Sequence, residues 1–334
     1  MEDHWRANRC YPALNSSCTK LARPQALYIL MYIFFSSISV STVLLNLLVI
    51  ISISHFKQLH TPTNLLILSL AVADLFIGLI VMPVEGSQLI ETCWYFGDTL
   101  CNIFPIISSV ALSGSLGSLV LISIDRFIAV SDPLRYSLKV THNKVTIIVI
   151  LSWCFCLLYM FFLLYDHLTA MEPQRTCHGE CRITVSFSRI VGDVFVSFIM
   201  PCSTVIILNL KIFCAAKYHT KMINSVTERQ RASNKGIIRS KKSSRKAAKT
   251  IGVLVTVYLL CYMPYNLSTF FVYNNQSLYF LLICLIWIMF LNSCINPIIY
   301  ALFYPWFKVS TKHIITLAIF HPGSSNANVN SDMK

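Results

Sequence analysis

The stretch that decides the fold class is TNLLILSLAVADLFIGLIVMPVEGSQLI, residues 63–90 of the chain. It contains no lysine or arginine, and its only acidic residues are Asp74 and Glu85. About 20 helical residues cross the hydrocarbon core of a bilayer, which is about 30 Å thick. Lipid offers no hydrogen-bond partners to open backbone groups, so this stretch predicts a membrane-spanning helix.

The composition of the whole chain agrees with this interpretation. Of its 334 residues, 55% are hydrophobic and 12% are charged, and the mean hydropathy is +0.64. Soluble domains carry about 25% charged residues. A soluble globule of this size could hardly cover its exterior, and a disordered chain would be far more polar. The composition therefore excludes both classes and indicates an integral membrane protein.

Seven stretches are long and apolar enough to cross a bilayer. They are Leu27–Ser54, Thr63–Ile90, Asn102–Val130, Val145–Tyr165, Ile190–Phe213, Thr250–Val272 and Leu278–Leu302. We therefore expect an all-α membrane protein, with a bundle of seven transmembrane helices over residues 27–302. An extracellular segment, residues 1–26, would precede the bundle. A short amphipathic C-terminal helix, Trp306–Phe320, and a cytoplasmic tail would occupy residues 303–334.

Basic residues predict the orientation in the membrane. Twelve lysines and arginines but a single acid, Glu228, lie between positions 211 and 249, within a net charge of +13. Cytoplasmic loops carry an excess of lysine and arginine, so this loop should be cytoplasmic and the N-terminus extracellular. Four basic residues before the first span would by themselves favour the opposite orientation. Because the charge is local, it favours a lipid bilayer as partner and no nucleic acid.

Six of the 13 cysteines fall on the expected outer face: Cys10, Cys18, Cys93, Cys101, Cys177 and Cys181. An even number in an oxidising compartment suits three disulfides, but spacing alone leaves fifteen pairings open. The sequon Asn15-Ser16-Ser17 lies in the same outer region, so Asn15 is a candidate glycosylation site.

Asp74 is the deepest of the charges expected inside the membrane. Ser115 in the third span and Asn292, Ser293 and Asn296 in the seventh lie at similar depth. A carboxylate with several neutral oxygens suits a sodium ion or a water cluster, and no lysine or arginine sits mid-membrane to neutralise it. The alternative is a polar network that only holds helices together. We favour the functional interpretation because the charge needs compensation.

Asp125-Arg126-Phe127 ends the third span. Alone, such an adjacent pair would be an ordinary solvated ion pair of little energetic value. Other motifs accompany it in the order of the spans: Asn46, LAVAD at 70–74, Trp153, Pro201, CYMP at 261–264 and NPIIY at 296–300. Together these motifs resemble the rhodopsin-like G-protein-coupled receptors over nearly the whole chain.

A narrower resemblance rests on IETCWYFGD at 90–98, CHGEC at 177–181, ALFYPWF at 301–307 and the pair Cys10 and Cys18. These segments resemble the trace amine-associated receptors, which are receptors and not enzymes. The resemblance implies three disulfides, Cys101–Cys181, Cys10–Cys177 and Cys18–Cys93, which would hold the N-terminal segment over the mouth of the ligand pocket.

The same resemblance implies partners and location. The partners would be a small amine, a heterotrimeric G protein of the stimulatory type and arrestin. No cofactor is expected beyond the candidate sodium ion. The receptor would lie in the plasma membrane of olfactory sensory neurons, and it would sense amines there.

The amine anchor of such receptors is an aspartate seven residues after the third-span cysteine, Cys101, but Ser108 occupies that position here. Asp193 lies eight residues before Pro201, in the outer half of the fifth span. This arrangement is similar to a fish branch of the family, in which the acid has moved to the fifth span. An intramembrane acid without an internal cation suits a protonated amine. The alternative is an Asp193 that faces outward and is solvated by the loop.

Helical spacing brings further side chains to the expected pocket. They are Tyr262, Tyr265, Asn266 and Thr269 on the sixth span, Ile283, Ile286, Trp287 and Phe290 on the seventh, Ser108 and Leu112 on the third, Ser197 below Asp193, and Ile183 in the loop. Aromatic faces attract an ammonium group by about 0.5–2 kcal/mol. Bundle packing is the alternative role for each of these stripes.

Glu85 follows Pro83 in the second span. We hypothesise that it provides a second anionic point for a diamine. The alternative is a solvated residue near the outer rim.

Signalling is expected as a shift between two conformations, because a ligand biases an equilibrium by its difference in affinity for the two states. The sixth span, kinked at Pro264, would move, and Arg126, freed from Asp125, would line the cleft for the G protein. The resemblance adds Asn296, Pro297 and Tyr300 to the switch. Four positions depart from the family pattern: Tyr258, Tyr262, Asn209 and Phe290.

Other functions remain open at this point. A transporter or channel is the main alternative from another class, although transporters usually show internal repeats and none is visible. A membrane enzyme would need metal ligands or a nucleophile with its base, and a light-sensing opsin would need a lysine in the seventh span. Among receptors, the alternative is a non-amine ligand, because the usual anchor is lost.

Overall fold

The computed structural model describes residues 9–169, 176–181, 185–227, 250, 252–268 and 279–329. Throughout these ranges the secondary structure is helical, with two isolated β-bridges and no strand. Six helices are long and apolar enough to span a membrane, and a shorter apolar helix, Gly252–Ser268, lies within the sixth predicted span. The prediction of an all-α transmembrane bundle is confirmed.

The membrane-spanning helices follow the predicted spans to within a few residues at most ends. They are α2 (Gln25–His55), α3 (Pro62–Phe76) continued by η2 (Ile77–Val81) and α4 (Met82–Glu91), α5 (Gly97–Ser131), α7 (His142–Leu163), α9 (Phe187–Asp193) continued by η3 (Val194–Ile199) and α10 (Met200–Thr227), and α12 (Tyr279–Phe303). Short elements connect or follow them: η1 (Lys57–Leu59), α6 (Tyr136–Lys139), α8 (Tyr165–Thr169), α13 (Pro305–Ile315), η5 (Ala318–Phe320) and η6 (Ser324–Asn326).

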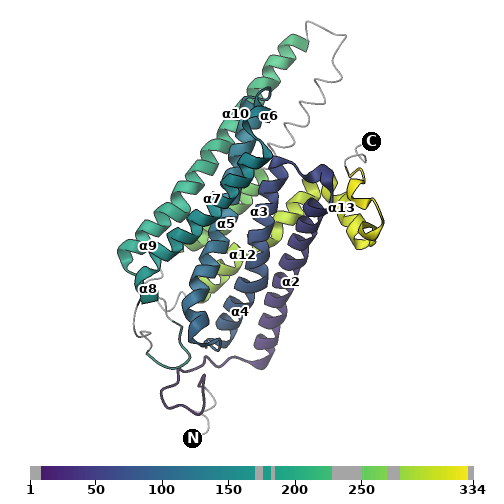
Figure 1. Ribbon diagram of the computed structural model, residues 1–334. Coiled ribbons are helices and arrows are strands. Elements are labelled where there is room, and N and C mark those ends of the chain that lie inside the picture. The colour runs from purple at the N-terminus through teal and green to yellow at the C-terminus, as the bar shows by residue number, and fades with distance from the viewer. Residues whose placement is uncertain are drawn as a thin grey trace.

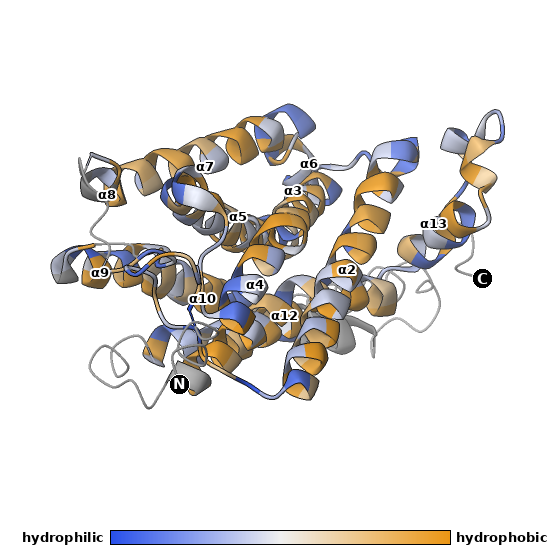
Figure 2. Cartoon of the chain, turned by 90° about the horizontal axis from the view of Figure 1, so that it is seen from below, coloured by the Kyte–Doolittle hydropathy of each residue, from blue (hydrophilic) through white to orange (hydrophobic). Residues whose placement is uncertain are grey.

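Helix α5 lies at the centre of the bundle and packs against α3, α7 and α10, while α2 packs against α3 and α12 (Figure 1). The N-terminal segment lies at one end of the bundle, and α13 turns across the opposite end (Figure 1). Figure 2, which looks along the bundle, shows hydrophobic residues over most of each long helix. On α7, Leu151, Leu158 and Phe162 are 62%, 68% and 69% exposed, as suits a surface that faces lipid.

Close packing at the centre depends on a few small residues. A Cβ atom added at Gly114 of α5 would lie 3.1 Å from the ring of Trp153, so a larger residue there would push the ring away by a few tenths of an ångström. The Trp153 indole nitrogen donates to the Ser69 hydroxyl at 3.0 Å, and the hydroxyls of Ser69 and Ser118 lie 2.9 Å apart. This chain of hydrogen bonds joins α7, α3 and α5 inside the apolar core.

Two of the helices contain a π-helical turn just before a proline. In η2 the backbone N–H of Met82 donates to the carbonyl of Ile77, and in η3 that of Met200 donates to Phe195. The following residues, Pro83 and Pro201, have no N–H to donate to the carbonyl four residues earlier. The wider turn supplies backbone hydrogen bonds around this gap, as membrane helices require.

The amphipathic C-terminal helix is shorter than predicted. Instead of reaching Phe320, α13 ends at Ile315, and Leu317 adopts a left-handed conformation with φ of 58°. The backbone N–H groups of Thr316 and Leu317 donate to Lys312 and Ile314, which closes the last turn. The prediction of a continuous helix over Trp306–Phe320 was therefore wrong beyond residue 315.

Candidate functional site

Asp193 is the last residue of α9, directly before the π-helical turn of η3. Its carboxylate is partly buried and accepts a hydrogen bond from the Tyr159 hydroxyl of α7, with an oxygen–oxygen distance of 3.3 Å. The Ser197 hydroxyl donates to the Asp193 carbonyl at 2.7 Å. Within the described residues, Asp193 forms no ion pair. A carboxylate inside a span thus has hydroxyl groups as its polar neighbours and, in the part of the chain described, no ion pair.

Tyr265 connects this carboxylate to the second predicted acid. Its hydroxyl interacts electrostatically with both Glu85 and Asp193, so residues from the second, fifth and sixth spans face a common region. Glu85 is partly buried in the first turn of α4, and among the described residues no hydrogen bond or ion pair reaches its carboxylate. Neither acid forms an ion pair in the part of the chain described here.

The other residues predicted for the sixth-span wall make contacts within their own helix. The ring of Tyr262 stacks on Tyr258, with 4.2 Å between ring centroids, and Tyr262 is 5% exposed. The Asn266 amide donates to the Tyr262 carbonyl at 3.0 Å. Two predicted lining residues, Ile183 and Thr269, lie outside the described residues.

Trp287 on α12 points toward α2 and α4. Its ring stacks on Phe35 at a centroid distance of 3.8 Å, and a Cβ atom at Gly86 would lie 3.3 Å from it. Phe290 meets Trp287 edge-on at 5.5 Å. These contacts are packing contacts between helices, and a ligand role for the two rings stays a prediction.

The remaining predicted lining residues are Ser108, Leu112, Ile283 and Ile286. Ser108 donates to the Pro105 carbonyl at 3.2 Å. Leu112 and Ile286 are partly buried, and Ile283 is 5% exposed.

The predicted polar cluster around Asp74 is assembled in the structure. Asp74 is fully buried, and its two carboxylate oxygens accept hydrogen bonds from Ser115 at 3.0 Å and from Asn296 at 2.8 Å. The Asn46 amide donates to the Ser293 carbonyl at 3.0 Å, which joins α2 to the same region of α12. Three helices thus converge on one buried carboxylate.

Several buried oxygens near this carboxylate have no hydrogen-bond partner. They are the side-chain oxygens of Asn46, Asn292, Ser293 and Asn296. Hard cations bind through carboxylate, amide and hydroxyl oxygens, so the residues present fit a sodium ion or ordered water. Burial without a partner would otherwise cost free energy at each of these oxygens.

At the other end of α5, Asp125 is enclosed by hydrogen-bond donors. The hydroxyls of Thr63 and Tyr136 donate to its carboxylate at 3.0 and 2.7 Å, and the Arg126 Nε donates at 2.8 Å. Arg126 also contacts the Thr63 hydroxyl. Asp125 is 4% exposed and Arg126 is partly buried, so this is not the solvated pair that adjacency alone suggested. We call Thr63, Asp125, Arg126 and Tyr136 the Asp125 cluster.

Three disulfides close the N-terminal end, and two of them differ from the predicted pairing. Cys101 pairs with Cys181, as the family resemblance implied. Cys10 pairs with Cys93 and not Cys177, and Cys18 pairs with Cys177 and not Cys93. The implied pairs Cys10–Cys177 and Cys18–Cys93 are thus corrected by the structure.

Backbone hydrogen bonds explain the observed pairing. Cys18 donates to the His178 carbonyl at 2.8 Å, and His178 donates to Ser16 at 2.8 Å, which aligns Cys18 beside Cys177. Cys10 lies instead at Gly179, where a Cβ atom would approach it to 2.8 Å and φ is 99°. Trp94 donates to the Gly179 carbonyl at 2.8 Å, which brings its neighbour Cys93 to Cys10.

Charged groups also hold the N-terminal segment to the end of α4. Arg23 donates to the carbonyls of Leu89 and Ile90 at 3.0 and 2.9 Å, and Lys20 pairs with Glu91. Burial lowers the pKa of Lys20, but the hydrogen bond and charge of Glu91 outweigh it and raise this pKa above its usual value. The segment is therefore attached by side chains as well as by disulfides.

Sequence reasoning missed three side chains in these sites: Tyr159, Thr63 and Tyr136. Tyr159 stands among leucine and phenylalanine in the fourth span, and its hydroxyl in an apolar helix was a visible signal. Thr63 and Tyr136 lie at the ends of their helices, where polar residues are common. No spacing rule connects them to Asp125.

The comparisons with known proteins agree with this architecture. Residues 45–300 match the family described as 7 transmembrane receptor (rhodopsin family). Seven apolar helical segments, the buried Asp74 cluster and the Asp125 cluster thus belong to a member of the rhodopsin family of receptors.

The chain is 37% identical to trace amine-associated receptor 13c of Danio rerio, covering 96% of this chain and 95% of that protein. It is 38% identical to trace amine-associated receptor 6 of Rattus norvegicus, covering 97% and 96%. It is 34% identical to trace amine-associated receptor 4 of Mus musculus, covering 96% and 94%. The chain belongs to the trace amine-associated receptor family. It is therefore a multi-pass membrane receptor and not an enzyme.

Proposed function

We propose that this receptor binds small protonated amines in the outer half of its bundle, with Asp193 as the partner of the ammonium group. One observation carries the proposal: Asp193 lies inside a span with the hydroxyls of Tyr159 and Ser197 as neighbours and without an ion pair in the described part of the chain. An ammonium group would supply the missing charge and up to three hydrogen-bond donors. The names of the relatives, which are trace amine-associated receptors, support this ligand class.

The second carboxylate suggests which amines would bind best. Glu85 has no polar partner in the described residues, and Tyr265 interacts with both Glu85 and Asp193. A diamine could pair one ammonium group with each acid, and Tyr265 would lie between them. Monoamines would use Asp193 alone, so the Glu85→Gln variant should weaken diamines selectively.

A sodium ion at Asp74 is the proposed inorganic ligand. Ser115 and Asn296 already contact the carboxylate, and the unpartnered oxygens of Asn292 and Ser293 would complete an oxygen site. A bound cation compensates the buried charge and stabilises the conformation that holds these oxygens together.

We assign residues 1–26 to the outside of the cell and residues 303–334 to the cytoplasm. The exposed Asn15 would then be available for glycosylation. Amine binding would favour a conformation in which the Asp125 cluster opens and Arg126 is released toward a heterotrimeric G protein. The family suggests a stimulatory G protein, later arrestin binding, and expression in olfactory sensory neurons.

The test is cAMP accumulation in cells that express the wild type or Asp193→Asn at matched surface density. Primary, secondary, tertiary and di-amines would be applied to each. A response that the substitution abolishes would establish Asp193 as the anchor. A response that survives would exclude it and direct attention to Glu85. Silence of the wild type toward every amine would favour a non-amine ligand, for which Ser108 at the usual anchor position is the specific argument.

A further inference from the structure

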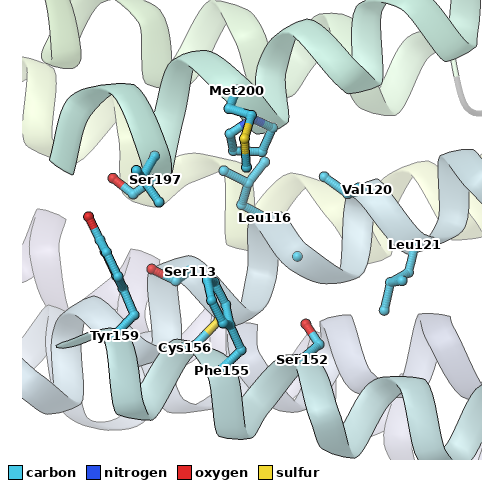
Figure 3. A pocket seen from close by; sticks show the side chains of 13 residues that line it. Ser113, Leu116, Val120, Leu121, Ser152, Phe155, Cys156, Tyr159, Ser197 and Met200 are labelled. Atoms are coloured by element: carbon cyan, nitrogen blue, oxygen red, sulfur yellow. The ribbon is translucent and has the colours of Figure 1, made fainter. Parts of the chain in front are cut away.

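A membrane-facing cavity of about 210 Å³ lies between α5, α7 and the η3–α10 segment. Both α7 and α10 pack against α5, and the surface between them is hollowed. Phe155 and Met200, which line the cavity, are 61% and 53% exposed, so it opens toward lipid and not toward the bundle axis. Figure 3 shows Tyr159 and Ser197 at one end of the cavity and Leu121 at the other.

The lining of the cavity is mostly apolar, with a few hydroxyl groups. None of the lining residues is charged, but Ser113 and Ser152 contribute hydroxyl groups. Serines in these helices commonly donate to the carbonyl four residues earlier, as Ser118 and Ser203 do at 2.8 and 2.7 Å. Ser113 and Ser152 have no hydrogen-bond partner among the described residues. The bilayer core holds no water to satisfy them.

Both hydroxyls line the cavity, Ser113 from α5 and Ser152 from α7. Ser113 and Gly117 lie one turn apart on α5, and a Cβ atom at Gly117 would be 3.1 Å from the Ser152 hydroxyl. The absence of a side chain at Gly117 therefore leaves room beside Ser152. A molecule there could accept a hydrogen bond from Ser152.

The volume limits the size of that molecule. A cavity of about 150 Å³ holds one benzene, so about 210 Å³ fits on the order of ten heavy atoms. This is smaller than a sterol or a whole phospholipid. The lack of charged lining residues disfavours an ion, since a charge in lipid without a partner is costly. The cavity is thus complementary to a small, neutral molecule with an apolar body and a hydroxyl group.

The cavity also touches the amine site. Tyr159 lines it and donates to the Asp193 carboxylate, and Ser197 lines it and donates to the Asp193 carbonyl. An occupant that moves the Tyr159 ring would change the hydrogen bond from Tyr159 to the Asp193 carboxylate.

We propose that this cavity binds a small lipophilic alcohol from the membrane, hydrogen-bonded to Ser152 beside Gly117, and that its occupancy modulates amine binding through Tyr159. The binding site stands independently of the proposed function, whereas the modulation rests on it.

Photolabelling of the full-length receptor in nanodiscs tests the binding site. The probe is a diazirine-bearing octanol, and labelled peptides are identified by mass spectrometry. Labelling should map to α5, α7 and α10 around the cavity and should be displaced by 1-octanol but not by octane. In the Ser113→Ala/Ser152→Ala variant, displaceable labelling should fall at least about fivefold. These alanines remove no hydrogen bond of the fold, and Ser203→Ala, outside the cavity, is the matched control.

Equal displacement by octane, or unchanged labelling in the double variant, would overturn the alcohol assignment and leave a cleft for lipid chains. For the modulation, 1-octanol should shift amine potency in the wild type and not in Tyr159→Phe. A shift of equal size in Tyr159→Phe would refute the route through Tyr159. Labelling as expected in a receptor that responds to no amine would retain the cavity site and reject the proposed function.

Discussion

Two aspartates near opposite ends of the bundle are held in opposite ways. Asp125 accepts hydrogen bonds from Thr63, Tyr136 and Arg126 at distances of 2.5–3.0 Å. The Asp193 carboxylate accepts a long hydrogen bond of 3.3 Å from Tyr159, and the Ser197 hydroxyl donates to the Asp193 carbonyl. The first carboxylate is satisfied by the protein itself and therefore stabilises one conformation of the helix ends. The second is left incomplete, as expected of a group that awaits a ligand.

Removal of the Asp193 charge should have the largest effect on amine potency. Asp193→Asn deletes the counter-charge of the ammonium group, and loss of a buried charged partner weakens binding strongly. We expect the half-maximal amine concentration to rise at least about 100-fold. It is measured by cAMP accumulation at matched surface density, with Asp132→Asn as the control. Unchanged potency would show that Asp193 is not the partner of the ammonium group. The contrast drawn with Asp125 would then be wrong.

Removal of the Asp125 charge should instead change the basal activity of the receptor, in the absence of a ligand. Asp125→Asn leaves Arg126 without its buried partner, which destabilises the closed arrangement. We expect ligand-independent cAMP to rise about fivefold while the amine concentration for half-response does not increase. Basal signalling equal to the wild type at equal expression would contradict a locking role for the Asp125 cluster.

The long hydrogen bond at Asp193 predicts a smaller change. Tyr159→Phe removes one neutral donor and keeps the ring, so amine potency should change by about threefold. Concentration–response curves for a monoamine and a diamine measure it, with Tyr165→Phe on the exposed α8 as the control. A loss as large as that of Asp193→Asn would mean that Tyr159 is itself the main contact.

Loss of one hydrogen bond in the Asp125 cluster should raise basal signalling less than loss of the Asp125 charge does. Tyr136→Phe removes the donor at 2.7 Å and leaves Thr63 and Arg126 in place. Basal cAMP should rise about twofold. A larger rise than in Asp125→Asn would show that Tyr136 acts outside this cluster.

Substitution of a third aspartate, Asp132, should have the smallest effect. Asp132 is exposed to solvent, and a hydrogen bond from Lys139 lowers its pKa below the usual value. Its contribution to stability is thus present above the unfolded-state pKa and is lost only as pH falls through the lowered folded-state pKa. Asp132→Asn should shift the melting temperature by less than about 2 °C. The shift should be the same at pH 6 and pH 8, since Asp132 stays ionised at both.

The sequence predicted most of what depends on periodicity. Length and hydropathy identified the spans, and helical spacing placed Asn292 and Asn296 on one face, where Asn296 reaches Asp74. These predictions succeed because a helix converts residue spacing directly into position. The Asp193 carboxylate was chosen as the amine partner because charges are rare in such spans, and this role stays a prediction.

Features that depend on loop geometry could not be predicted in this way. The pairing of Cys10 and Cys18 follows from hydrogen bonds at His178 and Gly179, which have no periodic signal. The partners of Asp125 come from separate helix ends at Thr63 and Tyr136. Helix α13 ends at Ile315, and Leu317 after it has a left-handed conformation. Leucine rarely adopts this conformation, so the residue type gave no signal of the helix end.

The π-helical turn of η3 sets the direction in which Asp193 points relative to α10. Such a turn contains one residue more than the α-helical turn that it replaces, and each α-helical residue rotates the chain by about 100°. Conversion of Val194–Ile199 to an α-helix with every residue kept would turn α9 by about that angle relative to α10 and carry the carboxylate to another face of the helix. A change of helix type at this turn, with the sequence unchanged, could thus relocate the charge between pocket and lipid.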